Sequence, residues 1–80
     1  MSTPAPRALH EIAREIRADW VTLSPYAKPY LDAMSTLVSV KDYYILDSGS
    51  SVVAYFLANA TGWRGDTARR VKAELKLMIK

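Results

Sequence analysis

Apolar residues recur at spacings of three and four along the first third of the chain, which is the pattern of an amphipathic helix. The pattern predicts a helix over residues 7–23, ending at Ser24-Pro25, because the residue before a proline disfavours the α region. Residues 1–6 contain two prolines and are expected to form a disordered tail. The predicted buried face of this helix is Leu9, Ile12, Ala13, Ile16, Trp20 and Leu23.

The same spacing predicts two further helices in the middle of the chain. Pro29 suits the first turn of a helix over residues 29–38. The predicted apolar positions of this helix are Tyr30, Leu31, Met34, Leu37 and Val38. A third helix is expected over residues 48–60, with Asp47 or Ser48 as its N-terminal cap. Its buried side would consist of Val52, Val53, Phe56, Leu57 and Ala60.

A glycine and an aspartate mark the boundary between the third and fourth helices. Gly62 is expected to end the third helix in a left-handed conformation, and Trp63 is expected to pack in the core behind it. Asp66 is the predicted cap of a fourth helix over residues 66–79. The predicted buried face of that helix is Ala68, Val71, Leu75, Met78 and Ile79.

The segment between the second and third helices has two interpretations. Ser39 and Asp42 have the spacing of a capping box, which favours a helical turn near residues 40–45. The β-branched and aromatic residues of the segment also suit an extended conformation. No strand pair is needed to account for the rest of the pattern. The sequence therefore predicts an all-α fold, a compact bundle of four main helices in one domain over residues 7–80.

Composition narrows the classes of function. The chain has 80 residues, no cysteine and one histidine, His10, so thiolate chemistry is excluded and no metal site is predicted. A chain this small buries only about 60–65% of its unfolded surface, which leaves little apolar surface to line a deep pocket. The longest apolar run, residues 52–58, is far short of the roughly 20 residues that span a bilayer. We therefore expect a cytoplasmic protein that is no enzyme, with no cofactor, small-molecule substrate or membrane partner.

Acidic residues form a row on the first helix, since Glu11, Glu15 and Asp19 follow one another at intervals of four. This row is predicted to be a solvated face, with binding of a cation or a basic partner as the alternative. The loop of residues 47–51 contains hydroxyls and a glycine but lacks the spacing of a nucleophile elbow or a phosphate loop. It is predicted to be a loop and helix cap.

Positive charge is concentrated at the end of the chain. Residues 64–80 contain six basic and two acidic side chains. At helical spacing, Arg69, Lys72, Lys76 and Lys80 share one sector beside the apolar face, whereas Leu77 lies outside that face. Tyrosines in the connections are also suited to a protein interface. The first hypothesis is a non-enzymatic module that binds another protein or a second copy of itself as a homodimer. Its predicted binding residues are Arg64, Arg69, Arg70, Lys72, Lys76, Leu77, Tyr43 and Tyr44.

The alternative hypothesis is DNA binding through a unit like a helix-turn-helix over residues 58–75. Ala58, Gly62, Trp63 and Val71 fit that template, whereas Ala68 stands where a larger aliphatic residue is usual. DNA ranks below protein as the expected partner. The residues assigned to DNA in this alternative are Arg64, Thr67, Arg69 and Lys72.

Several stretches of the sequence carry a resemblance to a group of phage proteins. These stretches are residues 9–20, 55–57, 59–60, 63–65 and 68–75. On these residues the chain resembles small uncharacterised helical accessory proteins of actinobacterial phages and prophages. The resemblance implies a small cytoplasmic accessory protein in a bacterial host and implies no catalytic residues. It also favours a host protein as the partner.

Overall fold

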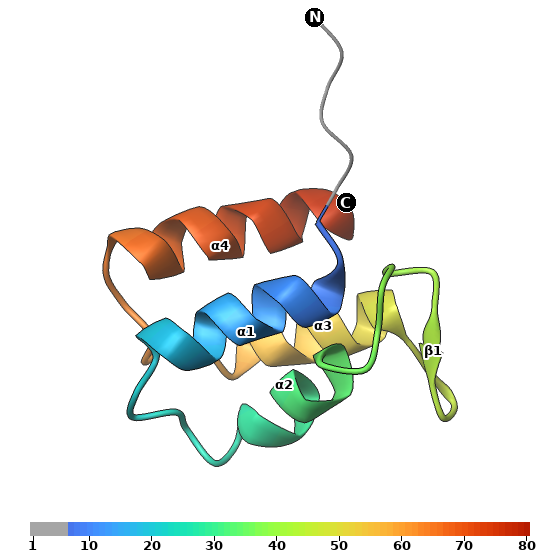
Figure 1. Ribbon diagram of the computed structural model, residues 1–80, viewed down its shortest axis with the longest axis horizontal. Coiled ribbons are helices and arrows are strands. Elements are labelled where there is room, and N and C mark those ends of the chain that lie inside the picture. Colours follow the sequence, from blue (N-terminus) through green and yellow to red (C-terminus); the bar gives the residue numbers. More distant parts are fainter. Residues whose placement is uncertain (1–6) are drawn as a thin grey trace, which may run out of the picture.

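Four helices and one short hairpin make up residues 7–80, the part of the chain that the computed structural model describes. Figure 1 shows α1 between α4 above and α2 below, with α3 behind α1 and the hairpin projecting from one edge. The helices are α1 (Leu9–Asp19), α2 (Lys28–Met34), α3 (Gly49–Ala58) and α4 (Asp66–Met78). The strands are β1 (Tyr43–Tyr44) and β2 (Asp47–Ser48), which pair antiparallel.

The prediction of a mainly helical fold with four helices is confirmed, but the fold is not purely all-α. The tail predicted for residues 1–6 lies outside the described residues. Both of the first two helices end earlier than predicted. Residues Val21 and Thr22, which follow α1, are β-branched and lose side-chain freedom in a helix. After α2, the hydroxyls of Ser35 and Thr36 donate to the carbonyl oxygens of Leu31 and Ala33 at 2.9 and 2.8 Å, which competes with continued helix.

The predicted cap of α3 is confirmed at Ser48, whose hydroxyl accepts a hydrogen bond from the Ser51 N–H at 3.2 Å. The predicted end of α3 is wrong in its mechanism. The helix ends at Asn59, whose side-chain amide donates to the Tyr55 carbonyl oxygen at 2.8 Å. Among the described glycines only Gly65 has a positive φ, of 112°, so Gly62 does not close the helix in a left-handed conformation.

The start of α4 also differs by one position from the prediction. Gly65 is the N-terminal cap, and Asp66 is the first helical residue rather than the cap. The backbone of Gly65, with φ 112° and ψ 179°, lies in a region that glycine alone adopts readily. This glycine therefore sets the direction in which α4 leaves the connection.

The segment before α3 forms the hairpin, so the helical turn near residues 40–45 is wrong and the extended alternative holds. Asp42 does accept hydrogen bonds from the Val38 and Ser39 N–H groups, at 3.1 and 3.0 Å, as its capping spacing suggested. The chain then turns outward because the Gly49 and Ser50 N–H groups donate to the carbonyl oxygens of Asp42 and Val40. These bonds, 2.7 and 3.0 Å long, hold the segment against the start of α3 and leave residues 43–48 to pair with each other.

The core contains the faces that the sequence predicted, with one exception. Leu31, Met34 and Leu37 are buried, but Val38, predicted on the same face, is 59% exposed because α2 ends at Met34. Trp20 and Trp63 are buried, and so are Ala68, Val71 and Leu75 of α4. Met78 and Ile79 are half-buried against this core, which confirms the predicted rotation of α4 about its axis. The other buried members of the predicted faces are Leu9, Ile12, Ala13, Ile16, Val52, Val53, Phe56 and Ala60.

Gly49 is predicted to be indispensable for the attachment of the hairpin. A Cβ at this position would lie 2.8 Å from the Ser39 carbonyl oxygen and from the Val40 Cα, both of them backbone atoms. We expect Gly49→Ala to lower the free energy of unfolding by about 1–3 kcal/mol, the usual cost of overpacking. Urea denaturation would measure this loss.

The matched control is Gly62→Ala, because a Cβ there meets nothing within 4 Å and Gly62 has no positive φ. This variant should stay within about 0.5 kcal/mol of the natural protein or gain slightly. Equal stability of the two variants would show that residues 39–40 do not approach Gly49 closely.

Candidate partner-binding surfaces

The residues predicted to bind a partner lie in two separate regions. The tyrosines lie on the hairpin at one edge of the molecule, and α4 begins at the opposite edge (Figure 1). Leu77, near the end of α4, is exposed as predicted, with 71% of its surface accessible. The predicted residues therefore do not form one continuous site, and each region has to be judged by its own contacts.

The connection before α4 is held by an aromatic cluster. The rings of Trp20 and Trp63 stack with centroids 5.8 Å apart and planes within 12° of each other. Phe56 of α3 packs edge-on against both indoles, at 6.3 and 6.4 Å. The Trp63 indole N–H donates to Asp19 Oδ2 at 2.8 Å, so the polar end of the buried ring is satisfied.

Lys72 is drawn into the same cluster. Its ammonium group donates to the Trp63 carbonyl oxygen at 2.7 Å and lies 5.9 Å from the centroid of the Trp63 ring. Partial burial lowers the pKa of Lys72, and the nearby charges of Lys76 and Arg64 lower it further. Lys72 thus stabilises the α3–α4 connection, whereas Arg64, Arg69 and Lys76 remain exposed.

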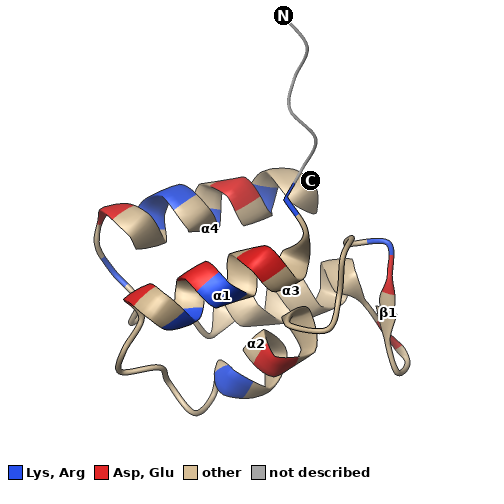
Figure 2. Cartoon of the chain, in the orientation of Figure 1, with Lys and Arg blue, Asp and Glu red and all other residues tan. Residues whose placement is uncertain are grey.

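Arg70 is also engaged within the chain. It pairs with Glu15 of α1, and Arg7 donates to both carboxylate oxygens of Glu74 at 2.6 and 2.9 Å. Arg7 Nη1 lies 2.9 Å from Glu15 Oε1, an ion-pair contact without the alignment of a hydrogen bond. Figure 2 shows these opposite charges along the neighbouring helices α1 and α4.

These contacts change two interpretations made from the sequence. The pKa of Glu15 is lowered, first by the hydrogen bond from Arg70 and also by Arg7, and the pKa of Arg7 is raised chiefly by Glu74. The acidic row of α1 is therefore not wholly a solvated face, because Glu15 and Asp19 contact the α4 side of the molecule. Arg70 pairs with Glu15 of α1, so this predicted partner-binding cation also has a contact within the chain, although its side chain remains 57% exposed.

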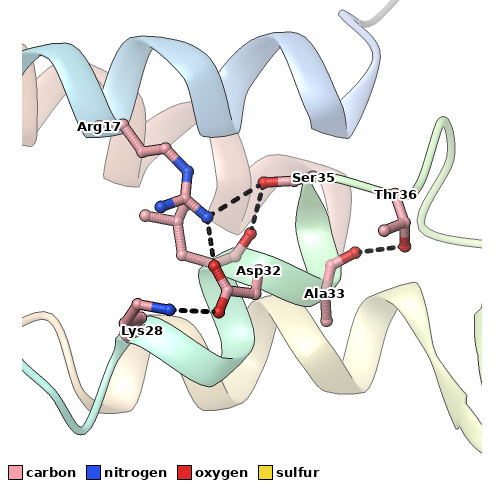
Figure 3. A network of polar contacts seen from close by, with 7 residues as sticks. Arg17, Lys28, Asp32, Ala33, Ser35 and Thr36 are labelled. Carbon is pink, nitrogen blue, oxygen red and sulfur yellow. Dashed lines mark hydrogen bonds and ion pairs between the residues drawn. The ribbon is translucent and has the colours of Figure 1, made fainter.

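A second charged cluster joins α1 to α2 (Figure 3). The Asp32 carboxylate accepts hydrogen bonds from Arg17 and from Lys28, the latter at 2.8 Å, and Ser35 lies 3.4 Å from the Arg17 guanidinium. Lys28 and then Arg17 lower the pKa of Asp32. The cluster is exposed and its charges are paired, which identifies it as a link between helices.

The exposed cations before and on α4 border a hollow of about 300 Å³. Its charged lining consists of Arg64, Arg69 and Lys72. Thr67, assigned to DNA in the alternative hypothesis, is half-buried in the first turn of α4. This hollow places positive charge around the N-terminal end of a helix, where anions are favoured.

The geometry around this hollow differs from a helix-turn-helix. In that motif a turn of about three or four residues joins helices that cross at a steep angle. Here a longer connection, residues 59–65, joins α3 to α4. The positive charge is present, but the connection is longer than the turn of that motif.

The hairpin carries strongly exposed apolar side chains. Tyr43 is 69% exposed, and the two residues of the tip, Ile45 and Leu46, are 81% and 89% exposed. Ile45 has a φ of 59°, which is strained for a β-branched residue. Sequence reasoning singled out Tyr43 and Tyr44 but missed the tip. The available signal was an apolar run, residues 43–46, that lies between two aspartates and outside every helical stripe.

A second hollow, of about 370 Å³, lies at the base of the hairpin. The backbone around it is fixed because the Leu9 and His10 N–H groups donate to the carbonyl oxygens of Val38 and Leu37, both at 2.9 Å. The residues that line the hollow are Arg7, Val38, Ser39, Val40, Lys41 and Met78. Its walls thus combine three apolar side chains with two cations.

Comparisons with protein-family models, with curated proteins and with solved structures give no match. Within residues 7–80, every helix is too short or too polar to cross a membrane. The same residues contain no group of three or more His, Asp or Glu side chains placed to hold a metal ion. The arguments for function therefore rest on the surfaces described above.

The Glu15 contacts predict a specific acid sensitivity. Because its pKa is lowered in the folded state, Glu15 stabilises the fold above its unfolded pKa, and this contribution is lost as the pH falls through the folded pKa. We expect the free energy of unfolding to fall as pH drops below about 5, and Glu15→Gln to remove part of that fall. Urea titrations at a series of pH values would measure it.

Glu11→Gln is the control, since Glu11 is an exposed residue of the same helix and forms no ion pair within residues 7–80. This variant should keep the pH profile of the natural protein. A Glu15→Gln profile parallel to that of the natural protein at every pH would contradict the assignment of Glu15 to the α1–α4 contact.

Proposed function

We propose that this protein is a non-enzymatic module that binds another protein through its hairpin. The observation that carries the proposal is the exposed apolar tip, Ile45 and Leu46, on a hairpin that is fixed at its base. Tyr43, one of the tyrosines expected at an interface, lies on the same hairpin and is exposed. Aromatic and aliphatic groups that cluster on a surface are the usual anchors of protein interfaces.

The strain at the tip supports a binding role. Ile45 occupies the first position of a two-residue turn, where a positive φ normally selects glycine. Because Ile45 is 81% exposed, burial within the chain does little to offset the cost of its backbone conformation. Strained residues of this kind concentrate at binding sites, where the partner supplies the compensating contacts.

Fixation of the hairpin base favours binding for a second reason. The Asp42 and Val40 carbonyl oxygens accept hydrogen bonds from the start of α3, and the Asp42 carboxylate holds the preceding turn. The tip is thereby presented in a defined position before any partner arrives. Binding then costs less conformational entropy than the ordering of a flexible loop.

The resemblance to phage and prophage accessory proteins suggests the setting of this function. In this proposal the protein acts in the cytoplasm of a bacterial host, and a host protein or a second copy of the chain covers the hairpin. The exposed cations of α4, Arg64, Arg69 and Lys76, form a separate surface that can guide an acidic partner during association.

Leu46→Asp is expected to abolish partner binding while leaving the fold intact. Leu46 is 89% exposed, so its replacement should change stability by no more than about 0.5 kcal/mol. A charge at the centre of an apolar interface should weaken binding by about tenfold or more. Affinity purification from an actinobacterial lysate, followed by quantification of each recovered protein, compares the variant with the natural chain.

Val21→Asp provides the matched control, because Val21 is an aliphatic residue that is 85% exposed in the α1–α2 connection. Both variants introduce the same charge at an exposed apolar position. A partner recovered equally with both variants would place the binding surface away from the hairpin and would refute the proposal.

DNA binding is the second candidate function, and the observation that favours it is the hollow lined by Arg64, Arg69 and Lys72. Three cations around the start of a helix suit contacts with backbone phosphates. Because the connection of residues 59–65 differs from a helix-turn-helix, such binding would depend mainly on charge and little on base sequence.

Under this second function, Arg69→Ala should weaken binding of duplex DNA equally for all sequences. The slope of log affinity against log salt should fall by about one, since one phosphate contact is lost. Fluorescence anisotropy with labelled duplexes at several salt concentrations measures both effects. Arg14→Ala, which removes the same charge from the exposed side of α1, should leave the slope unchanged. Absence of any binding at low salt would eliminate this candidate.

A further inference from the structure

The partner that the hairpin geometry fits is a second copy of this chain. We propose a two-fold dimer in which the Ile45–Leu46 tip of each copy enters the hollow at the hairpin base of the other. This inference rests on the proposed binding function of the hairpin and assigns its occupant. It is carried by three observations: the apolar match between tip and hollow, the charges beside each, and their positions on the molecule.

The tip and the hollow match in chemistry and size. The hollow of about 370 Å³ has Val38, Val40 and Met78 in its walls. Val38 is 59% exposed, so a large part of this apolar lining lacks a cover within the chain. Since a cavity of about 150 Å³ accommodates a molecule as large as benzene, this hollow has room for two aliphatic side chains.

The charges beside the tip and the hollow are opposite. Asp47 follows the tip directly and is exposed, and Lys41 is an exposed residue that lines the hollow. Neither side chain forms an ion pair within residues 7–80. Insertion of a tip into the hollow of another copy brings Asp47 of one copy toward Lys41 of the other, and symmetry makes this pair twice.

The tip and the hollow occupy separate positions on the molecule. In Figure 1 the tip after β1 lies at the lower right, and the connection that leads into β1 lies at the upper right. In the proposed dimer each copy can therefore offer its tip while its own hollow receives the tip of the other copy. Such a reciprocal contact is the self-complementary arrangement of an isologous dimer.

The pair of Asp47 and Lys41 supplies a test that distinguishes self-association from binding of a host protein. The purified full-length chain is studied by sedimentation velocity at concentrations up to about 1 mM, which reveals even weak association. Lys41→Glu and Asp47→Lys each place like charges at both pairs of the dimer. We expect each variant alone to dissociate about tenfold more readily than the natural chain.

An equimolar mixture of the two variants should associate as well as the natural chain, because both pairs of the mixed dimer then join opposite charges. Leu46→Asp should abolish association alone and in mixtures. Arg14→Glu is the control for Lys41→Glu, since Arg14 is exposed on α1 and lies outside the hollow. Circular dichroism confirms that each variant is folded.

Two outcomes would overturn the dimer. One is a chain that stays monomeric throughout the concentration range. The other is a dimer whose variants do not recover association when mixed, or whose association survives Leu46→Asp. If the chain is monomeric but Leu46→Asp still loses a protein captured from lysate, the hairpin binds a different protein. In that case the proposed function stands and only the identity of its partner fails.

Discussion

The stack of Trp63 on Trp20 joins the connection before α4 to the end of α1, and Phe56 adds α3 to the same contact. Each polar atom of Trp63 that this packing would isolate has a partner: the indole N–H donates to Asp19, and the carbonyl oxygen accepts from Lys72. Three helices thus meet at Trp63, whose ring is buried and whose indole N–H and carbonyl oxygen are both hydrogen-bonded. The start of α4, and with it the exposed cations, follows from this contact.

The charged residues of α4 separate into two groups for the same reason. Lys72 and Arg70 approach neighbouring elements and stabilise the fold, whereas Arg69 and Lys76 point to solvent. The hairpin lies apart from both groups of charged residues, because it extends from the edge of the bundle. The side chains that stabilise the fold and the exposed apolar tip therefore lie in different parts of this small chain.

Local patterns in the sequence were sufficient to predict the helices, because a stripe of apolar residues and a serine cap depend only on residues a few positions apart. The rotation of α4 and the burial of both tryptophans followed in the same way. The hairpin did not, since it depends on hydrogen bonds from Gly49 and Ser50 to residues that a capping pattern assigned to a helical turn. The role of Arg70 was equally hidden, because its partner, Glu15, is distant in sequence.

The close approach at Gly49 also limits how this sequence can diverge. The backbone atoms of Ser39 and Val40 occupy the space of a side chain there, and backbone cannot be exchanged by mutation. Substitutions at the exposed positions leave this contact untouched. At Gly49 and at Gly65, by contrast, the backbone itself restricts the residue, through close approach at the first and through a positive φ at the second.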